Sequence, residues 1–181
     1  MIFEDMQRLV PLRKQDFDAF YRILQESFPP QELRSRQEHL RLLDRQGYQV
    51  YACYAGQHLL AFLTVWEHPQ LAFVEHFAVA QSHRNQGLGG RLLGQLQERL
   101  GKRLCLEAEL PETEIACRRL GFYQRNGFYV NRFPYEQPPL EPWKAPVPLH
   151  LLTTDACLTQ AEFAQVRHWL YTVVYAGKTA Q

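Results

Sequence analysis

Apolar side chains in residues 16–28 recur at the i, i+3, i+4 and i+7 spacing of an amphipathic helix. Asp16 is available as the N-cap of this helix, and Pro29 and Pro30 end it. A second helix is predicted over residues 31–43, ending near Gly47. The apolar positions of the first helix are Phe17, Phe20, Tyr21, Leu24 and Phe28.

The pattern changes to strands after this point. Two runs rich in β-branched and aromatic residues, within 48–66, are separated by Gly56 and Gln57, which predicts a β-hairpin. A further strand is predicted over residues 72–80, with the sequence AFVEHFAVA. A glycine-rich segment follows it and leads into a helix over 91–101 that ends at a glycine.

The remaining elements alternate in the same manner. We expect a strand over 102–110, a helix opening at Pro111 and Thr113 and ending at Arg125, and a strand from 128 to 133. Residues 134–148 contain six prolines and are predicted to be a loop on the surface. A last strand over 147–154 precedes a last helix over 159–176, where Thr159 and Glu162 form a capping box.

This order of elements predicts an α/β fold. We expect a mixed, mostly antiparallel, twisted sheet of about six or seven strands, with helices on both faces. The chain has 181 residues, the size of one ordinary domain, and shows no internal repeat or inter-domain linker. We therefore predict a single domain over residues 1–181.

Composition narrows the class of protein. The hydrophobic fraction is 46% and the charged fraction 22%, as in an average globular chain. A formal net charge of +1 argues against a surface for nucleic acid or for an anionic membrane, since both need a cationic excess. The N-terminal segment MIFEDMQRLV has no targeting pattern, and no apolar run approaches a membrane span. A cytoplasmic location is expected.

Cysteine and histidine positions do not indicate a metal. The four cysteines form no C-x-x-C pair, so we interpret them as small buried hydrophobes in a reducing compartment. The seven histidines show no metal-ligand spacing, and no metal is expected. The cysteines are Cys53, Cys105, Cys117 and Cys157.

The segment Arg84-Asn85-Gln86-Gly87-Leu88-Gly89-Gly90 lies between a predicted strand and a predicted helix. Glycines there let the backbone approach a ligand closely, and the first turn of the helix has N–H groups without intrahelical partners. Together they form a cradle suited to a pyrophosphate, to which Arg84 can add a charged contact. The spacing fits neither a P-loop nor a G-x-G-x-x-G fingerprint, and an ordinary glycine-rich turn is the alternative.

Two motifs in this chain carry a resemblance to a known family. R-x-x-G-x-G followed by Gly-Arg-Leu-Leu, after a strand ending in Phe-Ala-Val, closely resembles the acyl-CoA-binding motif of the GNAT superfamily. Downstream, GFYQRNGF at residues 121–128 resembles the F/L-Y-x-x-x-G-F signature of that superfamily. The resemblance covers about residues 9–133, which leaves an extension over about 134–181.

The resemblance implies acetyl-CoA as co-substrate and roles for several residues. In the superfamily, the strand before the loop pairs with the pantetheine arm, which indicates the backbone of Phe77, Ala78 and Val79. The N–H of Val79 would stabilise the oxyanion formed from the thioester carbonyl. Tyr123 matches the tyrosine that protonates the departing thiolate, whose free pKa of about 8.5 is close enough to that of a phenol. The loop's pyrophosphate-binding backbone would be that of Asn85, Gln86, Gly87, Leu88, Gly89 and Gly90.

The amine must also lose a proton, and Glu75 is the first candidate to accept it. Glu75 is predicted to lie in an otherwise apolar strand, on the same face as Phe73, Phe77 and Val79, and a carboxylate inside such a strand usually has a reason. A partly solvated glutamate at the sheet end is the alternative. His76 would point to the opposite face as a core or helix-contact histidine.

Glu107 and Glu109 are weaker rivals for this role, and a chain of water molecules is another. One departure from the superfamily pattern is that Ala116 and Arg119 stand where many members have Asn and Ala. Finer side-chain contacts to CoA therefore do not carry over, whereas the assignment of Tyr123 does. Phe133, Tyr135 and Trp143 of the extension could line an acceptor pocket or cover the sheet.

The function expected from this resemblance is transfer of an acetyl group from acetyl-CoA to a primary amine of a small molecule or peptide. No cysteine lies in the motif region, so direct attack in a ternary complex is expected rather than a covalent enzyme intermediate. The alternatives are a non-catalytic acyl-CoA sensor, transfer of a longer acyl chain, and a scaffold that assembles through its last helix. That helix either packs on its own chain or forms a homodimer.

Overall fold

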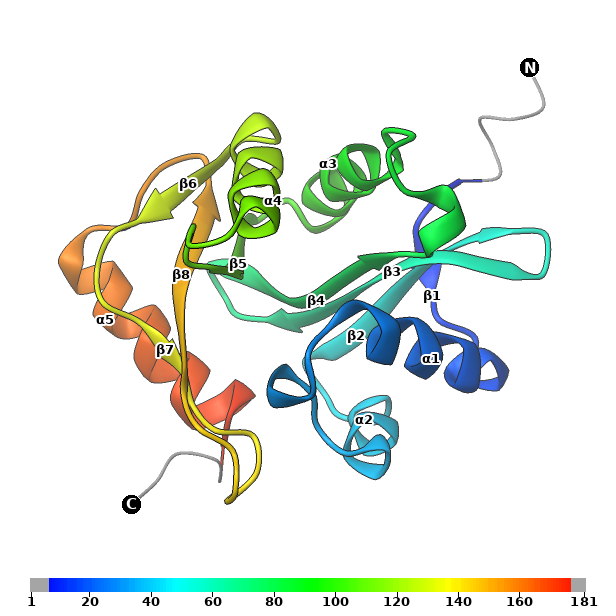
Figure 1. The fold of residues 1–181 in the computed structure, drawn as a ribbon, viewed down its shortest axis with the longest axis horizontal. Coiled ribbons are helices and arrows are strands. Elements are labelled where there is room, and N and C mark those ends of the chain that lie inside the picture. Colours follow the sequence, from blue (N-terminus) through cyan, green and yellow to red (C-terminus); the bar gives the residue numbers. More distant parts are fainter. Residues whose placement is uncertain (1–6, 177–181) are drawn as a thin grey trace. The chain divides into compact units, whose positions relative to one another are not determined.

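The computed structural model describes residues 7–176, which divide into two compact units (Figure 1). Unit 1 comprises the described residues up to Pro29 together with Ser35–Lys102. Unit 2 comprises Pro30–Arg34 and the described residues from Arg103 onwards. The single domain expected over residues 1–181 stays a prediction.

Unit 1 is built on four antiparallel strands in the order β1-β2-β3-β4. The predicted hairpin over 48–66 is confirmed as β2 and β3, and Gly56 makes its turn at a φ of 60°. The predicted strand over 72–80 is confirmed as β4. The strands are β1 (Val10–Pro11), β2 (Tyr48–Ala55), β3 (His58–Glu67) and β4 (Leu71–Val79).

A bulge interrupts the pairing of β4 with β3. Val74 pairs with Val65 and His76 pairs with Thr64, so Glu75 is an extra residue without a pairing partner of its own on β3. The extra residue reverses the alternation of side chains beyond it. Phe73 therefore faces the opposite side of the sheet from Phe77 and Val79, and the prediction that all of these share one face with Glu75 is wrong.

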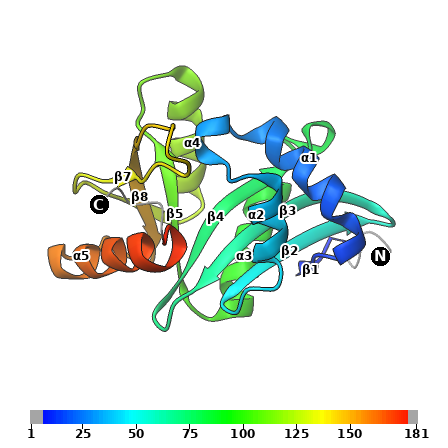
Figure 2. The ribbon, with the colours of Figure 1, turned by 90° about the horizontal axis from the view of Figure 1, so that it is seen from below.

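Helices cover both faces of the unit 1 sheet, with α1 (Phe17–Ser27) and α2 (Arg36–Leu42) on one face and α3 (Leu88–Leu100) on the other (Figures 1 and 2). Phe20 of α1 packs edge-on against Phe62 of β3, with ring centroids 4.6 Å apart. Short 3-10 turns precede α1 (η1, Lys14–Asp16) and α3 (η3, Gln81–His83).

The start of each of the first two helices differs from the prediction. The stretch 31–43 is not one helix, because a 3-10 turn, η2 (Pro30–Glu32), ends before Ser35. Ser35 caps α2 and forms a capping box with Glu38. Asp16 stands at the N-cap of α1 without a capping hydrogen bond, because its carboxylate accepts from Arg13 Nε at 2.6 Å.

Unit 2 is organised around β8, which pairs antiparallel with three other strands. The predicted mostly antiparallel sheet flanked by helices is confirmed. Residues 7–176 contain eight strands rather than six or seven, and the difference arises because β1 and β7, of two residues each, are too short to give a pattern in the sequence. Among residues 7–176, no helix has the length and apolar character needed to cross a membrane. The elements are β5 (Arg103–Glu109), α4 (Glu114–Arg125), β6 (Phe128–Asn131), β7 (Glu136–Gln137), β8 (Val147–Thr154), α5 (Gln160–Trp169) and the π-helical turn η4 (Leu170–Val174).

The predicted last helix is present as α5 and η4, and it packs on its own chain. Its buried face consists of Phe163, Val166, Leu170 and Val174. From the extension, Phe133 lies against Phe163 with ring centroids 5.0 Å apart. Phe133 and Tyr135 also line a cavity of about 550 Å³ in unit 2, so lining of a pocket and packing within the extension both occur. Trp143, by contrast, is 79% exposed.

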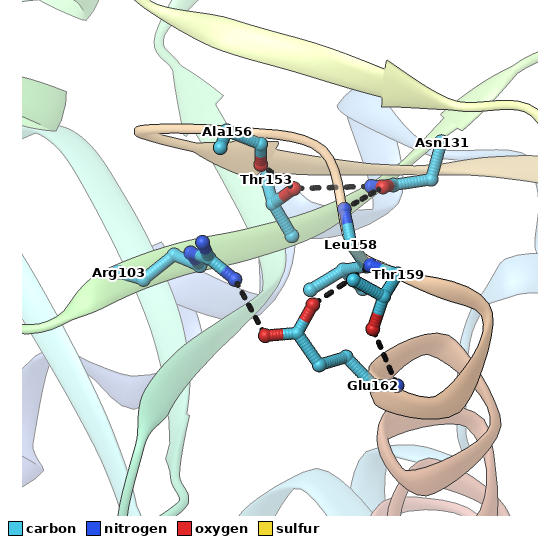
Figure 3. Close-up of polar contacts among 7 residues, drawn as sticks. All are labelled: Arg103, Asn131, Thr153, Ala156, Leu158, Thr159 and Glu162. Atoms are coloured by element: carbon cyan, nitrogen blue, oxygen red, sulfur yellow. Dashed lines mark hydrogen bonds and ion pairs between the residues drawn. The ribbon is translucent and has the colours of Figure 1, made fainter.

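A buried asparagine fixes the entry to α5 (Figure 3). Asn131 Oδ1 accepts from Leu158 N at 2.6 Å, and its Nδ2 donates to Leu151 O at 3.0 Å and to Thr153 Oγ1 at 3.1 Å. The predicted capping box follows at once, since Thr159 N donates to Glu162 Oε2 at 2.7 Å. The connection from β8 to α5 is therefore held by side-chain hydrogen bonds.

The prediction of buried cysteines holds for only half of them. Cys53 and Cys105 are buried free thiols, whereas Cys117 and Cys157 are exposed. Cys117 lies in α4 and Cys157 in the turn before α5, positions whose exposure the spacing of cysteines does not reveal.

Replacing Asn131 by Ala is expected to lower the free energy of unfolding by about 2–4 kcal/mol. The change leaves the buried Leu158 N–H without its acceptor and removes two further hydrogen bonds. Thermal or urea unfolding measures the effect, with Gln165→Ala on the exposed face of α5 as control. Equal stability of the two variants would show that Asn131 does not hold the connection.

Candidate active site

The turn from β4 into α3 has the geometry of an anion cradle. Asn85 and Gly87 adopt left-handed backbone conformations, with φ of 62° and 74°, and Gly87 is the N-cap of α3 without a side-chain cap. Arg91 N donates to Gly87 O at 3.4 Å, so the N–H groups of residues 88–90 precede the hydrogen-bonded part of the helix. The loop is exposed at residues 84–87. Its backbone N–H groups and the positive helix end are therefore available to an anion.

The Arg84 side chain connects this turn to β4 and to α1. Its Nε donates to Val79 O at 2.9 Å, at the end of β4, and its Nη2 donates to Ser27 Oγ at 3.3 Å, at the end of α1. The side chain predicted to contact a phosphate thus holds the loop to two other elements of unit 1. Binding of a CoA phosphate by Arg84 stays a prediction.

The end of β4 presents backbone groups on the edge that does not pair with β3. Ala80 N donates to Leu60 O at 2.8 Å, on the β3 side. Because successive residues of a strand point their N–H groups to alternate edges, those of Phe77 and Val79 point away from β3. Ala78 between them has a buried side chain. Within unit 1 these are the backbone groups that an added extended segment would meet.

Glu75 lies in the bulge described above, half-buried. Its Oε2 accepts a hydrogen bond from Trp66 Nε1 at 2.7 Å. The carboxylate therefore has a fixed orientation on β4. His76, the next residue, is buried against Phe28 and His39, with ring centroids 4.8 and 5.8 Å away, as expected for a helix-contact histidine.

Tyr123 of α4 is 8% exposed and packs against Phe122 and Phe128. Phe122 is only half-buried, so the tyrosine itself takes the inward position of the helix. Burial raises the pKa of Tyr123 to about 12, while Arg119 lowers it and Glu109 raises it. The phenol therefore keeps its proton at neutral pH. Among residues 7–176, no group hydrogen-bonds its hydroxyl.

Two charged side chains near Tyr123 pair with each other. Arg119 Nη1 donates to Glu109 Oε2 at 2.9 Å, joining α4 to the end of β5. Sequence reasoning missed a third member, Glu32 of η2, whose pKa is raised to about 7 mainly by burial and secondly by Glu109. An acidic residue just after a double proline is the only signal that could have drawn attention to it.

Glu107 is held differently. It accepts hydrogen bonds from the hydroxyls of Tyr135 and Tyr175, the latter at 3.0 and 2.9 Å to its two oxygens. Donors to a carboxylate favour its charged form. Glu107 thus connects β5 to Tyr135, which precedes β7, and to Tyr175, which follows the π-helical turn η4. Residues 7–176 contain no group of three or more potential metal ligands.

Comparison with known protein families identifies the family to which this chain belongs. The sequence model described as the acetyltransferase (GNAT) family matches residues 17–128, which run from α1 through β4, the turn, α3 and Tyr123. This chain is a GNAT acetyltransferase family member. The resemblance expected from the two motifs is therefore confirmed.

Two relatives agree with this assignment. A Bacillus subtilis (strain 168) protein named "Putative acetyltransferase YjbC" is 32% identical over 111 residues, which are 60% of this chain and 56% of that protein. The chain thus matches little more than half the length of this curated relative. A solved structure named "Putative acetyltransferase from GNAT family from Bacteroides thetaiotaomicron" is 32% identical with a TM-score of 0.86, and the match covers 94% of this chain and 99% of that one.

More distant GNAT structures share the fold. A Bacillus subtilis acetyltransferase solved in complex with CoA has 20% identity and a TM-score of 0.58, covering 83% of this chain and 99% of that one. A GNAT acetyltransferase of Elizabethkingia anophelis solved with acetyl-CoA bound has 18% identity and a TM-score of 0.53, covering 84% of this chain and all (100%) of that one.

Gly87→Ala tests the turn of this GNAT chain directly. A Cβ at Gly87 meets nothing within 4 Å, so the expected loss of about 1–2 kcal/mol comes from the left-handed conformation alone. Gly94→Ala in the interior of α3 is the matched control and should stabilise by up to about 1 kcal/mol. Unfolding curves give both values. If both substitutions changed the free energy of unfolding in the same direction, the left-handed geometry at Gly87 would be contradicted.

Proposed function

We propose that this protein transfers the acetyl group of acetyl-CoA to a primary amine by direct attack in a ternary complex. The observation that carries the proposal is the end of β4, where backbone N–H groups that point away from β3 are followed by η3, a left-handed turn and the N-terminus of α3. Membership of the GNAT family and the CoA-bound relatives support acetyl-CoA as the co-substrate.

The proposed roles in binding follow from these backbone groups. The backbone of Phe77 to Val79 would hold the extended pantetheine arm, and the N–H groups of residues 85–90 would hold the pyrophosphate. Acetyl-CoA supplies the acetyl group already activated as a thioester. The Val79 N–H would donate to the acetyl carbonyl oxygen, where negative charge develops during attack.

Tyr123 is proposed as the proton donor to the departing CoA sulfur. Its burial keeps the phenol protonated, as a donor must be, with a pKa of about 12. Because this value lies well above neutrality, loss of the Tyr123 proton should not limit the rate below about pH 10. Glu75 is a candidate for accepting the proton of the amine.

Tyr123→Phe is expected to lower kcat for CoA release by roughly 10²-fold, the usual scale for a general acid. The assay measures free CoA with acetyl-CoA and four amines: an alanine-initiated peptide, spermidine, tyramine and glucosamine. Tyr129→Phe on β6 is the control, because Tyr129 is 49% exposed. Acetyl-CoA affinity should be unchanged in both variants, which separates chemistry from binding.

Two results would count against this function. Unchanged kcat in Tyr123→Phe would remove the tyrosine from the chemistry. Tight binding of acetyl-CoA with no CoA release for any amine in the panel would favour a binding module that senses acyl-CoA over a transferase.

A further inference from the structure

Two hollows in the surface of unit 2 meet at the end of β6. The first is the cavity of about 550 Å³ lined by Phe133 and Tyr135, and the second has about 780 Å³. Arg132, the residue after β6, and His150 of β8 line both hollows. Every residue that lines either hollow belongs to unit 2. We call the two hollows together the Arg132 groove.

The pairing of β6 with β8 explains why Arg132 and His150 meet. Asn131, the last residue of β6, pairs with Leu151 of β8. One step further along both strands sets Arg132 opposite His150, where side chains lie on the same face with Cβ atoms about 5 Å apart. A guanidinium has only donors, and an imidazole offers at least one N–H. The two neighbours can therefore donate together to one acceptor between them.

A second arginine, Arg167 of α5, lines the first hollow together with Arg132. Within residues 7–176, neither of these guanidinium groups forms an ion pair with a carboxylate. Three other arginines of unit 2, by contrast, each pair with a glutamate, namely Arg103, Arg118 and Arg119. Arg132 and Arg167 are thus available to an anion from outside the chain.

One carboxylate, that of Glu136 on β7, also lines the first hollow. The hydroxyl of Tyr171 donates to the backbone oxygen of Glu136 at 2.6 Å, which holds this part of β7 beside the C-terminal helix. The first hollow therefore has two guanidinium groups and one carboxylate in its lining, and the lining of the second has no acidic residue. The groove as a whole favours a negatively charged ligand.

Aromatic and apolar side chains form much of the remaining lining. Hollows of this size that combine apolar surface with a few convergent polar groups are typical of small-molecule sites. The groove thus matches an apolar body that carries an oxyanion. In the first hollow the rings are those of Phe133, Tyr135 and Tyr171, and the second contains Leu120, Phe128 and Tyr129.

We propose that the Arg132 groove binds a small organic anion, an aromatic or aliphatic body that carries a carboxylate or phosphate group. Arg132 and Arg167 donate to the oxyanion, since guanidinium groups bind carboxylates and phosphates through paired N–H···O contacts. His150 adds a further donor beside Arg132. The groove shares no residue with the acetyl-CoA contacts proposed above, so this inference does not depend on the transferase function.

The first test is calorimetric titration of the purified protein with 3-phenylpropionate and with phenyl phosphate at neutral pH and low salt. The wild type should bind at least one of them, and the two probes distinguish a carboxylate ligand from a phosphate ligand. Arg132→Gln and Arg167→Gln should each weaken binding by about 10-fold or more, because each loses a charged hydrogen-bond donor. Arg125→Gln, an exposed arginine of α4 outside the groove, should bind as the wild type does.

A change of opposite sign is expected at the one acidic residue of the groove. Glu136→Gln should tighten binding of the same probe by about 2–5-fold, because it removes a like charge from the exposed lining. Neutral 3-phenylpropanol, which has the same apolar body, should bind about 10-fold more weakly than 3-phenylpropionate. In NMR spectra of the wild type, the ring signals of His150 and Tyr171 should shift as the bound probe is added.

The outcomes distinguish the proposed site from other uses of the groove. Equal affinity for the alcohol and the carboxylate would overturn oxyanion recognition, as would unchanged affinity in Arg132→Gln. Failure of both anions to bind at millimolar concentration would overturn the site altogether. Saturating CoA should leave probe binding unchanged, and competition by CoA would assign the groove to CoA instead of a separate ligand. Melting temperatures without ligand report whether each variant is folded.

Discussion

The turn between β4 and α3 is the constraint on which the proposed chemistry depends. Two left-handed residues, Asn85 and Gly87, reverse the chain so that the edge of β4 leads directly to the open end of a helix. The Arg84 guanidinium then ties the turn to the Val79 carbonyl at 2.9 Å. One continuous piece of backbone can in this way meet both an extended arm and an anion.

Several buried titratable groups lie in unit 2, and their surroundings differ. Burial raises the pKa of Tyr123 to about 12 and that of Glu32 to about 7, whereas Glu107 accepts hydrogen bonds from two tyrosine hydroxyls. The C-terminal extension contributes to this pattern, since it provides Tyr135 and Tyr175, and its Lys144 Nζ donates to Leu33 O at 2.6 Å.

Local signals in the sequence predicted most elements and the family, because periodicity, caps and the two motifs are local. The Thr159 capping box, the Gly56 turn and the helix carrying Tyr123 are examples. The bulge at Glu75 was not predictable, since an extra residue in one strand is defined only by its partner strand, and it reversed the expected face of Phe73. Glu32 was missed for a similar reason: Glu109 and Arg119, the charged residues that influence its pKa, lie far away in the sequence.

The most direct test of the central claim is the melting temperature of the purified protein with acetyl-CoA. At about 100 times its dissociation constant, a ligand of the folded state adds about 2.7 kcal/mol, or roughly 5–10 °C for a chain of this size. The account predicts such a rise, and a smaller one in Gly87→Ala at the same concentration. A folded protein whose melting temperature does not respond to acetyl-CoA would contradict the assignment of the turn after β4 as its binding site.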